Sequence, residues 1–278
     1  MTAERDPGAG LDLGQALRIV RTTLLMRMRV GGGARFGRGG RPRGLIWLCV
    51  LYAVMGGFIG ALAPAVHLDV FTYALILFGM SFFLGGTMVI SEASEVLFNV
   101  READILGHRP IHPRTLLFAK ALSLFLLSAA LSLALNLVPT ALGVTIAPRP
   151  GLFPLTHVAV ALLTSLFAAG SVVFLYAVLT RAVGRQRFDA FVSWSQVGAT
   201  IVMILGYQIV PRLMDRLHGF RIDHERSWLV LLPPAWFAAL ESIVVGEPPT
   251  PRLWIMAALA VVATGALAWT AVARTASC

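Results

Sequence analysis

The residues best suited to chemistry lie in one charged segment, residues 92–120, between two long apolar runs. Two of its histidines, His108 and His112, are four residues apart, a spacing that allows zinc binding when both lie on one helix. Pro110 lies between them, and proline interrupts a regular helix, so that geometry is lost. We therefore expect no metal site here and expect both histidines to be surface groups.

A membrane-embedded protease would need paired carboxylates, or a serine with a histidine, at membrane depth. The acidic residues of segment 92–120 lie beyond the apolar runs, and Asp189 lies at the edge of one. The usual role of polar side chains inside such runs is hydrogen bonding between helices. The ones we single out are Asn136, Ser193, Ser195 and Gln196. We predict no catalytic residues.

The composition indicates a membrane protein. The chain of 278 residues is 57% hydrophobic and only 13% charged, whereas soluble domains are about 25% charged. Its net charge of +9 comes from 22 arginines and a single lysine, Lys120. In a membrane protein such an excess reflects cytoplasmic loops and anionic lipid, so we expect the lipid bilayer as a partner and no nucleic acid. No cleavable signal peptide is expected.

Six apolar stretches are long enough to cross a bilayer, which takes about 20 residues. They are Leu45–Val66, Val70–Ile90, Ala121–Ile146, Thr156–Thr180, Phe191–Val210 and Leu253–Ala273. A seventh stretch, Trp228–Val245, contains Glu241 and is interrupted by Pro233 and Pro234. It better suits a re-entrant or interfacial helix. The predicted fold class is an all-α polytopic membrane protein with six transmembrane helices.

The distribution of basic residues predicts the orientation. With the N-terminus inside, seventeen of the 23 basic residues would be cytoplasmic, including nine arginines before residue 44. Positive residues favour the cytoplasmic side. We therefore expect both termini and segment 92–120 inside, and the segment 211–252 outside. The abundance of arginine over lysine suggests a prokaryotic plasma membrane.

The N-terminal region, residues 1–43, is expected to form a cytoplasmic unit ahead of the transmembrane domain, residues 44–274. Residues 11–30 show helical periodicity, with Leu13, Leu17, Val20, Leu24 and Met28 on one stripe. Such an amphipathic helix suits the membrane interface. A basic, glycine-rich linker follows it. The alternative is a helix that packs on the rest of the protein.

Glycines in the first apolar stretch form a GxxxG pattern at Gly56 and Gly60. Glycines at this spacing let two helices approach closely, either within one chain or between two copies. Pro139 is expected to kink the third stretch.

The order of these parts resembles the membrane (permease) subunit of a type-2 ABC transporter, exporter-like. The local matches are residues 102–120, EADILGHRPIHPRTLLFAK, and residues 231–240, LLPPAWFAAL. The resemblance implies that the first match couples the subunit to an ATPase. The coupling residues would be Glu102, Asp104, Ile105, Leu106, His108, Arg109, Pro110, Ile111 and Arg114. It also implies that Pro233, Pro234 and Trp236 belong to an external re-entrant helix.

The resemblance further implies an ATP-driven exporter assembled from several parts. The chain has no GxxxxGK[ST] motif, so it would bind no cofactor itself, and ATP and Mg would lie on a separate ABC ATPase subunit. A second membrane half would complete the unit, as an identical chain, a related one, or the other half of a twelve-span polypeptide.

Two other functions are compatible with the sequence. An ATP-independent secondary transporter or channel would show paired halves with similar broken spans, and only one broken segment is evident. An integral membrane enzyme would require a polar cluster at membrane depth, which the sequence does not reveal.

Overall fold

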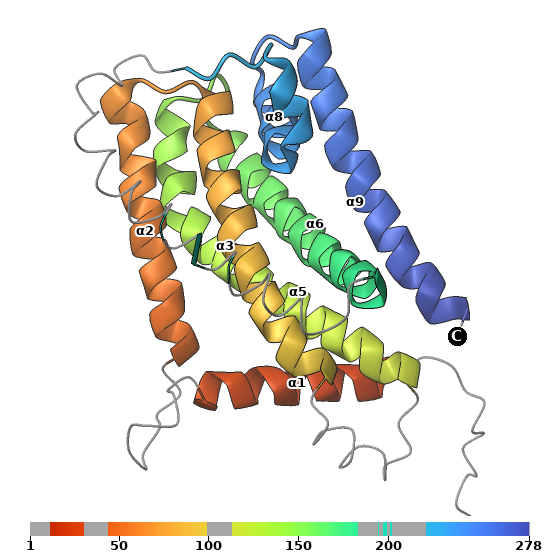
Figure 1. The fold of residues 1–278 in the computed structure, drawn as a ribbon. Helices are drawn as coiled ribbons and strands as arrows, with labels where there is room; N and C mark the ends of the chain where they lie inside the picture. Colours follow the sequence, from red (N-terminus) through yellow and green to blue (C-terminus); the bar gives the residue numbers. More distant parts are fainter. Residues whose placement is uncertain are drawn as a thin grey trace, which may run out of the picture.

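A computed structural model describes residues 12–30, 44–98, 113–182, 194, 197–198, 201 and 221–277. Within these ranges every regular element is a helix (Figure 1). The elements are α1 (Leu13–Val30), α2 (Gly44–Val66), α3 (Val70–Phe98), α5 (Pro113–Leu142), η1 (Gly143–Thr145), α6 (Phe153–Ala182), η3 (Ser227–Leu231), α8 (Pro233–Val245) and α9 (Pro251–Ser277). The long helices form a bundle. Helix α1 lies across one end, the α1 end, and α8 lies at the opposite end, the α8 end.

Four described helical stretches are long and apolar enough to cross a membrane. They are Val70–Val89, Phe118–Thr145, Phe153–Leu175 and Pro251–Thr270. Two shorter apolar helical stretches are Leu45–Ala61 and Pro233–Val245. The described part of the chain is therefore all-helical and suited to a membrane. The predicted fifth span, Phe191–Val210, lies outside the described residues apart from single helical positions.

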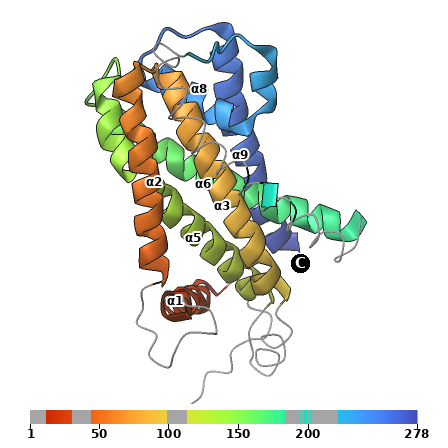
Figure 2. The ribbon, with the colours of Figure 1, turned by 60° about the vertical axis from the view of Figure 1, so that its left-hand side comes forward.

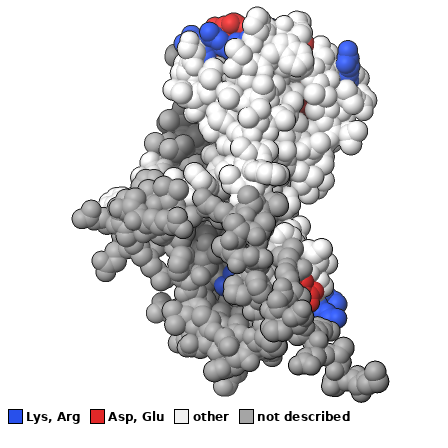
Figure 3. Space-filling view, turned by 90° about the vertical axis from the view of Figure 1, so that its right-hand side faces the viewer, with Lys and Arg blue, Asp and Glu red and all other residues white. Residues whose placement is uncertain are grey.

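Exposed tryptophans lie toward both ends of the bundle. Trp254 and Trp228 lie at the α8 end, and Trp47 and Trp269 lie toward the α1 end; all four are at least half exposed. Tryptophan is enriched where a membrane meets water, so these two groups fit the two faces of a bilayer. Figure 3 agrees, because the described charged residues gather toward the ends of this face of the molecule.

Helix α1 is fixed to the base of α5. Asp12 caps the helix, since its side chain accepts a hydrogen bond from the Gln15 amide at 3.0 Å. The Asp12 amide in turn donates to the Thr115 hydroxyl at 3.1 Å. Buried Ala16 and Val20 pack against Ala119 of α5. Figure 2 views α1 nearly along its axis, beside the lower ends of α2 and α5.

The predicted apolar stripe of this helix is divided between two environments. Val20 is buried, and Leu24 packs against the small cluster at the base of α5. Leu13 and Leu17 are instead more than half exposed. The face toward the bundle is therefore centred on Ala16 and Val20, because the small Ala16 side chain permits close approach to α5. Placement of the exposed leucines in the membrane interface stays a prediction.

Segment 222–247 enters and leaves the bundle at the same end. The Ile222 amide donates to the Thr72 hydroxyl at 2.9 Å, and the Val70 amide donates to Glu247 Oε1 at 3.1 Å. Both Thr72 and Val70 lie in the first turn of α3. Between these two anchor points the chain descends through η3 and returns through α8.

The depth of this descent follows from aromatic contacts. The Trp236 and Phe237 rings lie 5.8 and 5.5 Å from the ring of Phe167 in α6, measured between centroids. Phe167 also stacks on Phe82 at 6.1 Å, and Phe82 lies about 18 Å along α3 from its start. Helix α8 therefore begins well inside the bundle.

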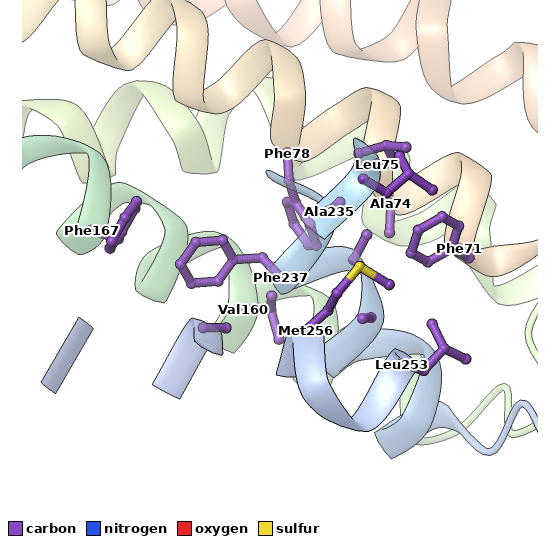
Figure 4. Close-up of a cluster of buried hydrophobic side chains, with 14 of the residues drawn as sticks. Phe71, Ala74, Leu75, Phe78, Val160, Phe167, Ala235, Phe237, Leu253 and Met256 are labelled. Atoms are coloured by element: carbon purple, nitrogen blue, oxygen red, sulfur yellow. The ribbon is translucent and has the colours of Figure 1, made fainter. Parts of the chain in front are cut away.

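Helix α8 is held there by one apolar core. Its side chains Ala235 and Phe237 belong to one buried cluster with Phe71 and Phe78 of α3, to which α6 and α9 also contribute (Figure 4). The two prolines at its start, Pro233 and Pro234, suit the first turn because no intrahelical donor is needed there. Gly246 ends the helix with φ of 101°, a left-handed conformation that glycine adopts readily.

The glycines of α2 pack within the chain. A Cβ atom at Gly56 would overlap the carbonyl oxygen of Leu135 in α5, and one at Gly60 would lie 3.1 Å from Pro139 Cα. Pro139 has no N–H, so the Leu135 carbonyl four residues earlier has no helical donor. The seam between α2 and α5 thus runs along the interrupted part of α5. Of the two alternatives for the GxxxG pattern, the structure shows contact within one chain.

Glu247 lies in the loop between α8 and α9 and holds the end of segment 222–247 against the start of α3. Burial raises the pKa of the Glu247 carboxyl, and the nearby charge of Asp69 adds to the rise. A raised carboxyl pKa means that the folded protein holds this proton more tightly than the unfolded chain. Ionised Glu247 therefore lowers stability at neutral pH, and the loss is relieved as pH falls through the folded-state pKa.

We expect Glu247→Gln to be more stable than the parent protein at pH 7, because glutamine keeps an oxygen for the Val70 amide and cannot ionise. The difference should shrink as pH falls and vanish below about 4.3, where a free glutamate is also protonated. Thermal unfolding in detergent at a series of pH values measures it. Glu225→Gln, at a half-exposed carboxylate of the same end, is the control. A difference of equal size at every pH would contradict this account.

Candidate functional site

The predicted coupling residues cannot be placed in the described structure. Glu102, Asp104, Ile105, Leu106, His108, Arg109, Pro110 and Ile111 lie outside the described residues. Arg114 lies in the first turn of α5. The two helices that flank them reach the α1 end of the bundle: α3 ends there and α5 begins there (Figure 1).

The residues predicted for the re-entrant helix lie together at the start of α8. Pro233 and Pro234 occupy its first turn. The Trp236 indole N–H donates to the carbonyl oxygen of Val230 at 2.7 Å, which closes η3 against α8. These residues shape the descending segment, and they carry no ionisable group.

A buried polar cluster instead lies where four helices meet. It consists of Ser81 of α3, Ser132 and Asn136 of α5, His157 of α6 and Glu241 of α8. His157 and Glu241 have no exposed surface, and the other three are at most 5% exposed. Burial of this many polar groups in an apolar bundle is costly unless each is hydrogen-bonded. We take this cluster as the candidate functional site.

His157 is the centre of the cluster. Its Nδ1 lies 2.8 Å from Glu241 Oε1 and 3.1 Å from Oε2. Its Nε2 lies 3.1 Å from Asn136 Oδ1. Both ring nitrogens are thus engaged, and the histidine links α8 to α5.

The Asn136 side chain fixes one proton position on the ring. Asn136 Nδ2 donates to the carbonyl oxygen of Ser132 at 2.7 Å and to Ser81 Oγ at 2.8 Å. A carbonyl oxygen only accepts, so the amide nitrogen must face it and Oδ1 must face His157. Since Oδ1 is also only an acceptor, Nε2 of His157 carries a hydrogen.

Aromatic rings enclose the imidazole. The rings of Phe78 and Phe153 stack against His157 with centroids 5.2 Å away, and Tyr73 lies at 6.2 Å. The Tyr73 hydroxyl is itself used, because it donates to the carbonyl oxygen of Pro139 at 2.7 Å. Gly143 permits this crowding, since a Cβ there would collide with the Phe153 ring. The enclosure keeps water from the His157–Glu241 pair.

This arrangement can hold and exchange protons. Among the described residues, no group of three or more histidine, cysteine, aspartate or glutamate side chains is arranged to hold a metal ion. The cluster joins a histidine and a carboxylate on different helices, and such buried ionisable groups in membrane segments are most often functional.

His157 is not among the residues predicted from the sequence, and no polar cluster at membrane depth was predicted. The structure corrects this, since Asn136, His157 and Glu241 meet inside the bundle. A signal was present, because His157 is an ionisable residue inside the fourth apolar stretch. Its partner could not be read from spacing, as Glu241 lies 84 positions further along the chain.

Comparison with known proteins adds no assignment: no protein-family model matches this sequence, and neither a curated protein nor a solved structure does.

Proposed function

We propose that this chain is the transmembrane subunit of an ATP-driven exporter of the type-2 ABC kind, coupled to a separate ATPase subunit. One observation carries the proposal: the N-terminal amphipathic helix and the proline-containing segment before the last helix, both expected of such a subunit, lie at opposite ends of one bundle. Helix α1 lies at the end where α3 stops and α5 begins, and segment 222–247 enters and leaves at the other.

This arrangement supports the coupling role of segment 92–120. Helix α3 ends and α5 begins at the α1 end, where the Asp12–Thr115 hydrogen bond ties α1 to α5. A push on the start of α5 would therefore also move α1. Long helices that pack rigidly transmit such a push to the α8 end. The unit would need two membrane halves and two ATPases, in a prokaryotic plasma membrane with both termini inside.

The test is a pull-down of this chain in mild detergent from the cells that encode it, with the amount of co-purified P-loop ATPase as the measurement. We expect the triple variant Glu102→Ala, Asp104→Ala, Leu106→Ala to lose nearly all of the bound ATPase and the ATP-dependent transport. The matched control replaces two acids and a leucine at the α8 end: Asp223→Ala, Glu225→Ala, Leu231→Ala. Full ATPase binding by the first variant would rule out coupling through segment 92–120.

The second candidate is an ATP-independent secondary transporter or channel subunit. The buried His157–Glu241 pair favours it, because chains of histidine and carboxylate groups carry protons in pumps and transporters. Purified chain in liposomes separates the two functions. Substrate movement driven by a pH gradient without ATP would support the second candidate, and movement only with ATPase and ATP would support the first.

A further inference from the structure

We propose that His157 and Glu241 form a single proton-binding site that holds two protons and no net charge in the folded protein. The site goes beyond either proposed function, since it follows from hydrogen bonding and burial alone. Three heavy-atom contacts define the site: His157 Nδ1 to Glu241 at 2.8 Å, Nε2 to Asn136 Oδ1 at 3.1 Å, and Asn136 Nδ2 to the Ser132 carbonyl at 2.7 Å.

Two arrangements of hydrogens satisfy these contacts. Nε2 carries a hydrogen in both, because Asn136 Oδ1 accepts from it. In the first arrangement Nδ1 also carries a hydrogen and donates to an ionised Glu241. In the second the carboxyl group of Glu241 is protonated and donates to a bare Nδ1. Both contain two protons, and they differ only in the position of one proton along a 2.8 Å contact.

Other proton counts are unfavourable. Removal of one proton leaves a bare Nδ1 facing a carboxylate, two acceptors 2.8 Å apart. Addition of one gives an imidazolium beside a protonated carboxyl group. Either change also leaves a net charge where both side chains are 0% exposed, and burial of an uncompensated charge is costly.

The surroundings supply no charge that would compensate. Of the described side chains that face the pair, Ser81 and Asn136 are neutral, and the one further titratable group is Tyr73 of α3. Its hydroxyl is turned to the Pro139 carbonyl. Of the described charged residues of the α8 end, Arg252 and Glu225 pair with each other at the surface.

A pH dependence with a defined sign follows. In the unfolded chain the free imidazole and the free glutamate titrate near pH 6.5 and about 4.3. Above about pH 6.5 the unfolded pair holds one proton and the folded pair holds two, so folding takes up a proton. The folding equilibrium constant should then fall about tenfold per pH unit as pH rises.

Glu241→Gln removes this dependence without breaking the cluster. The glutamine amide can donate to Nδ1 while Nε2 still donates to Asn136, so the histidine is neutral in both states above about pH 6.5. We expect the difference in folding equilibrium constant between parent and variant to change about tenfold per pH unit above that value. Reversible unfolding of the full chain in mixed micelles measures it.

The matched control is Glu225→Gln, which removes the carboxylate of a half-exposed histidine–glutamate pair at the same end, His224 Nε2 to Glu225 Oε1 at 3.8 Å. It should have the same pH profile as the parent. A second readout is the ¹⁵N spectrum of histidine-labelled protein. His157 should keep a hydrogen on Nε2 throughout the pH series. Identical pH profiles for parent and Glu241→Gln, or a bare Nε2 on His157, would overturn the proposal.

Discussion

Gly56→Ala is expected to destabilise the bundle by about 3 kcal/mol, the upper end of the usual cost of overpacking. The added methyl group would overlap the carbonyl oxygen of Leu135 in α5. That atom belongs to the backbone, so it cannot rotate away as a side chain would. Helices α2 and α5 must instead move apart along their seam. Unfolding in a denaturing detergent, followed by helix content, measures the loss.

Two neighbouring glycines provide a graded series. A Cβ at Gly60 would lie 3.1 Å from Pro139 Cα, tighter than ordinary contact, so Gly60→Ala should cost less than Gly56→Ala. A Cβ at Gly57 would lie 3.4 Å from a Val138 methyl group, which is ordinary contact, and Gly57→Ala should be tolerated.

The matched control is Gly86→Ala in α3, where a buried Cβ would meet no atom within 4 Å. It should be neutral or stabilising by up to about 1 kcal/mol, since alanine favours helix over glycine. Equal losses at Gly56, Gly57 and Gly60, with a change in oligomeric state, would instead place the glycines between two copies of the chain.

The packing of α2 against α5 also shows which features of the fold can be predicted from the sequence and which cannot. The helices themselves follow from runs of about 20 apolar residues, as at Val70–Val89 and Pro251–Thr270. The broken character of α8 follows from Pro233 and Pro234. The partner of Gly56 does not follow, because the GxxxG pattern fixes the spacing of a close contact and leaves its partner open.

The contacts within the buried polar cluster cannot be predicted from the sequence for a related reason. The contacts that join its helices through His157 link residues 21 and 84 positions apart, so spacing along the chain does not identify the partners. The sequence predicts a re-entrant or interfacial helix here that contains Glu241, and this carboxylate is the signal for a buried partner. A glutamate in an apolar helix needs a partner, and His157 is the buried one. The candidate coupling residues between α3 and α5 stay a prediction from sequence.

His157→Phe is expected to cost about 3–5 kcal/mol, the usual loss when one partner of a buried ion pair is removed. Phenylalanine keeps the ring among Phe78 and Phe153, so packing changes little. Glu241, however, has no exposed surface and loses its hydrogen bonds to the imidazole. The free energy of unfolding in detergent measures the loss.

The control is His224→Phe. This histidine also contacts a phenylalanine ring, Phe71, at 5.8 Å, but its carboxylate partner Glu225 is half exposed. The loss there should stay below about 1 kcal/mol, as for other surface pairs. Equal losses at the two histidines would show that the ring contact matters and the buried pair does not.

The double variant His157→Phe, Glu241→Leu separates stability from function. Replacement of a whole buried pair by apolar groups is often neutral or stabilising, so most of the loss from the single change should be recovered. Purely additive losses would mean that the two side chains are not coupled. If the double variant is stable but no longer transports, the pair costs stability and is kept for its protons. A stable variant that transports normally would make the pair a structural link between α6 and α8.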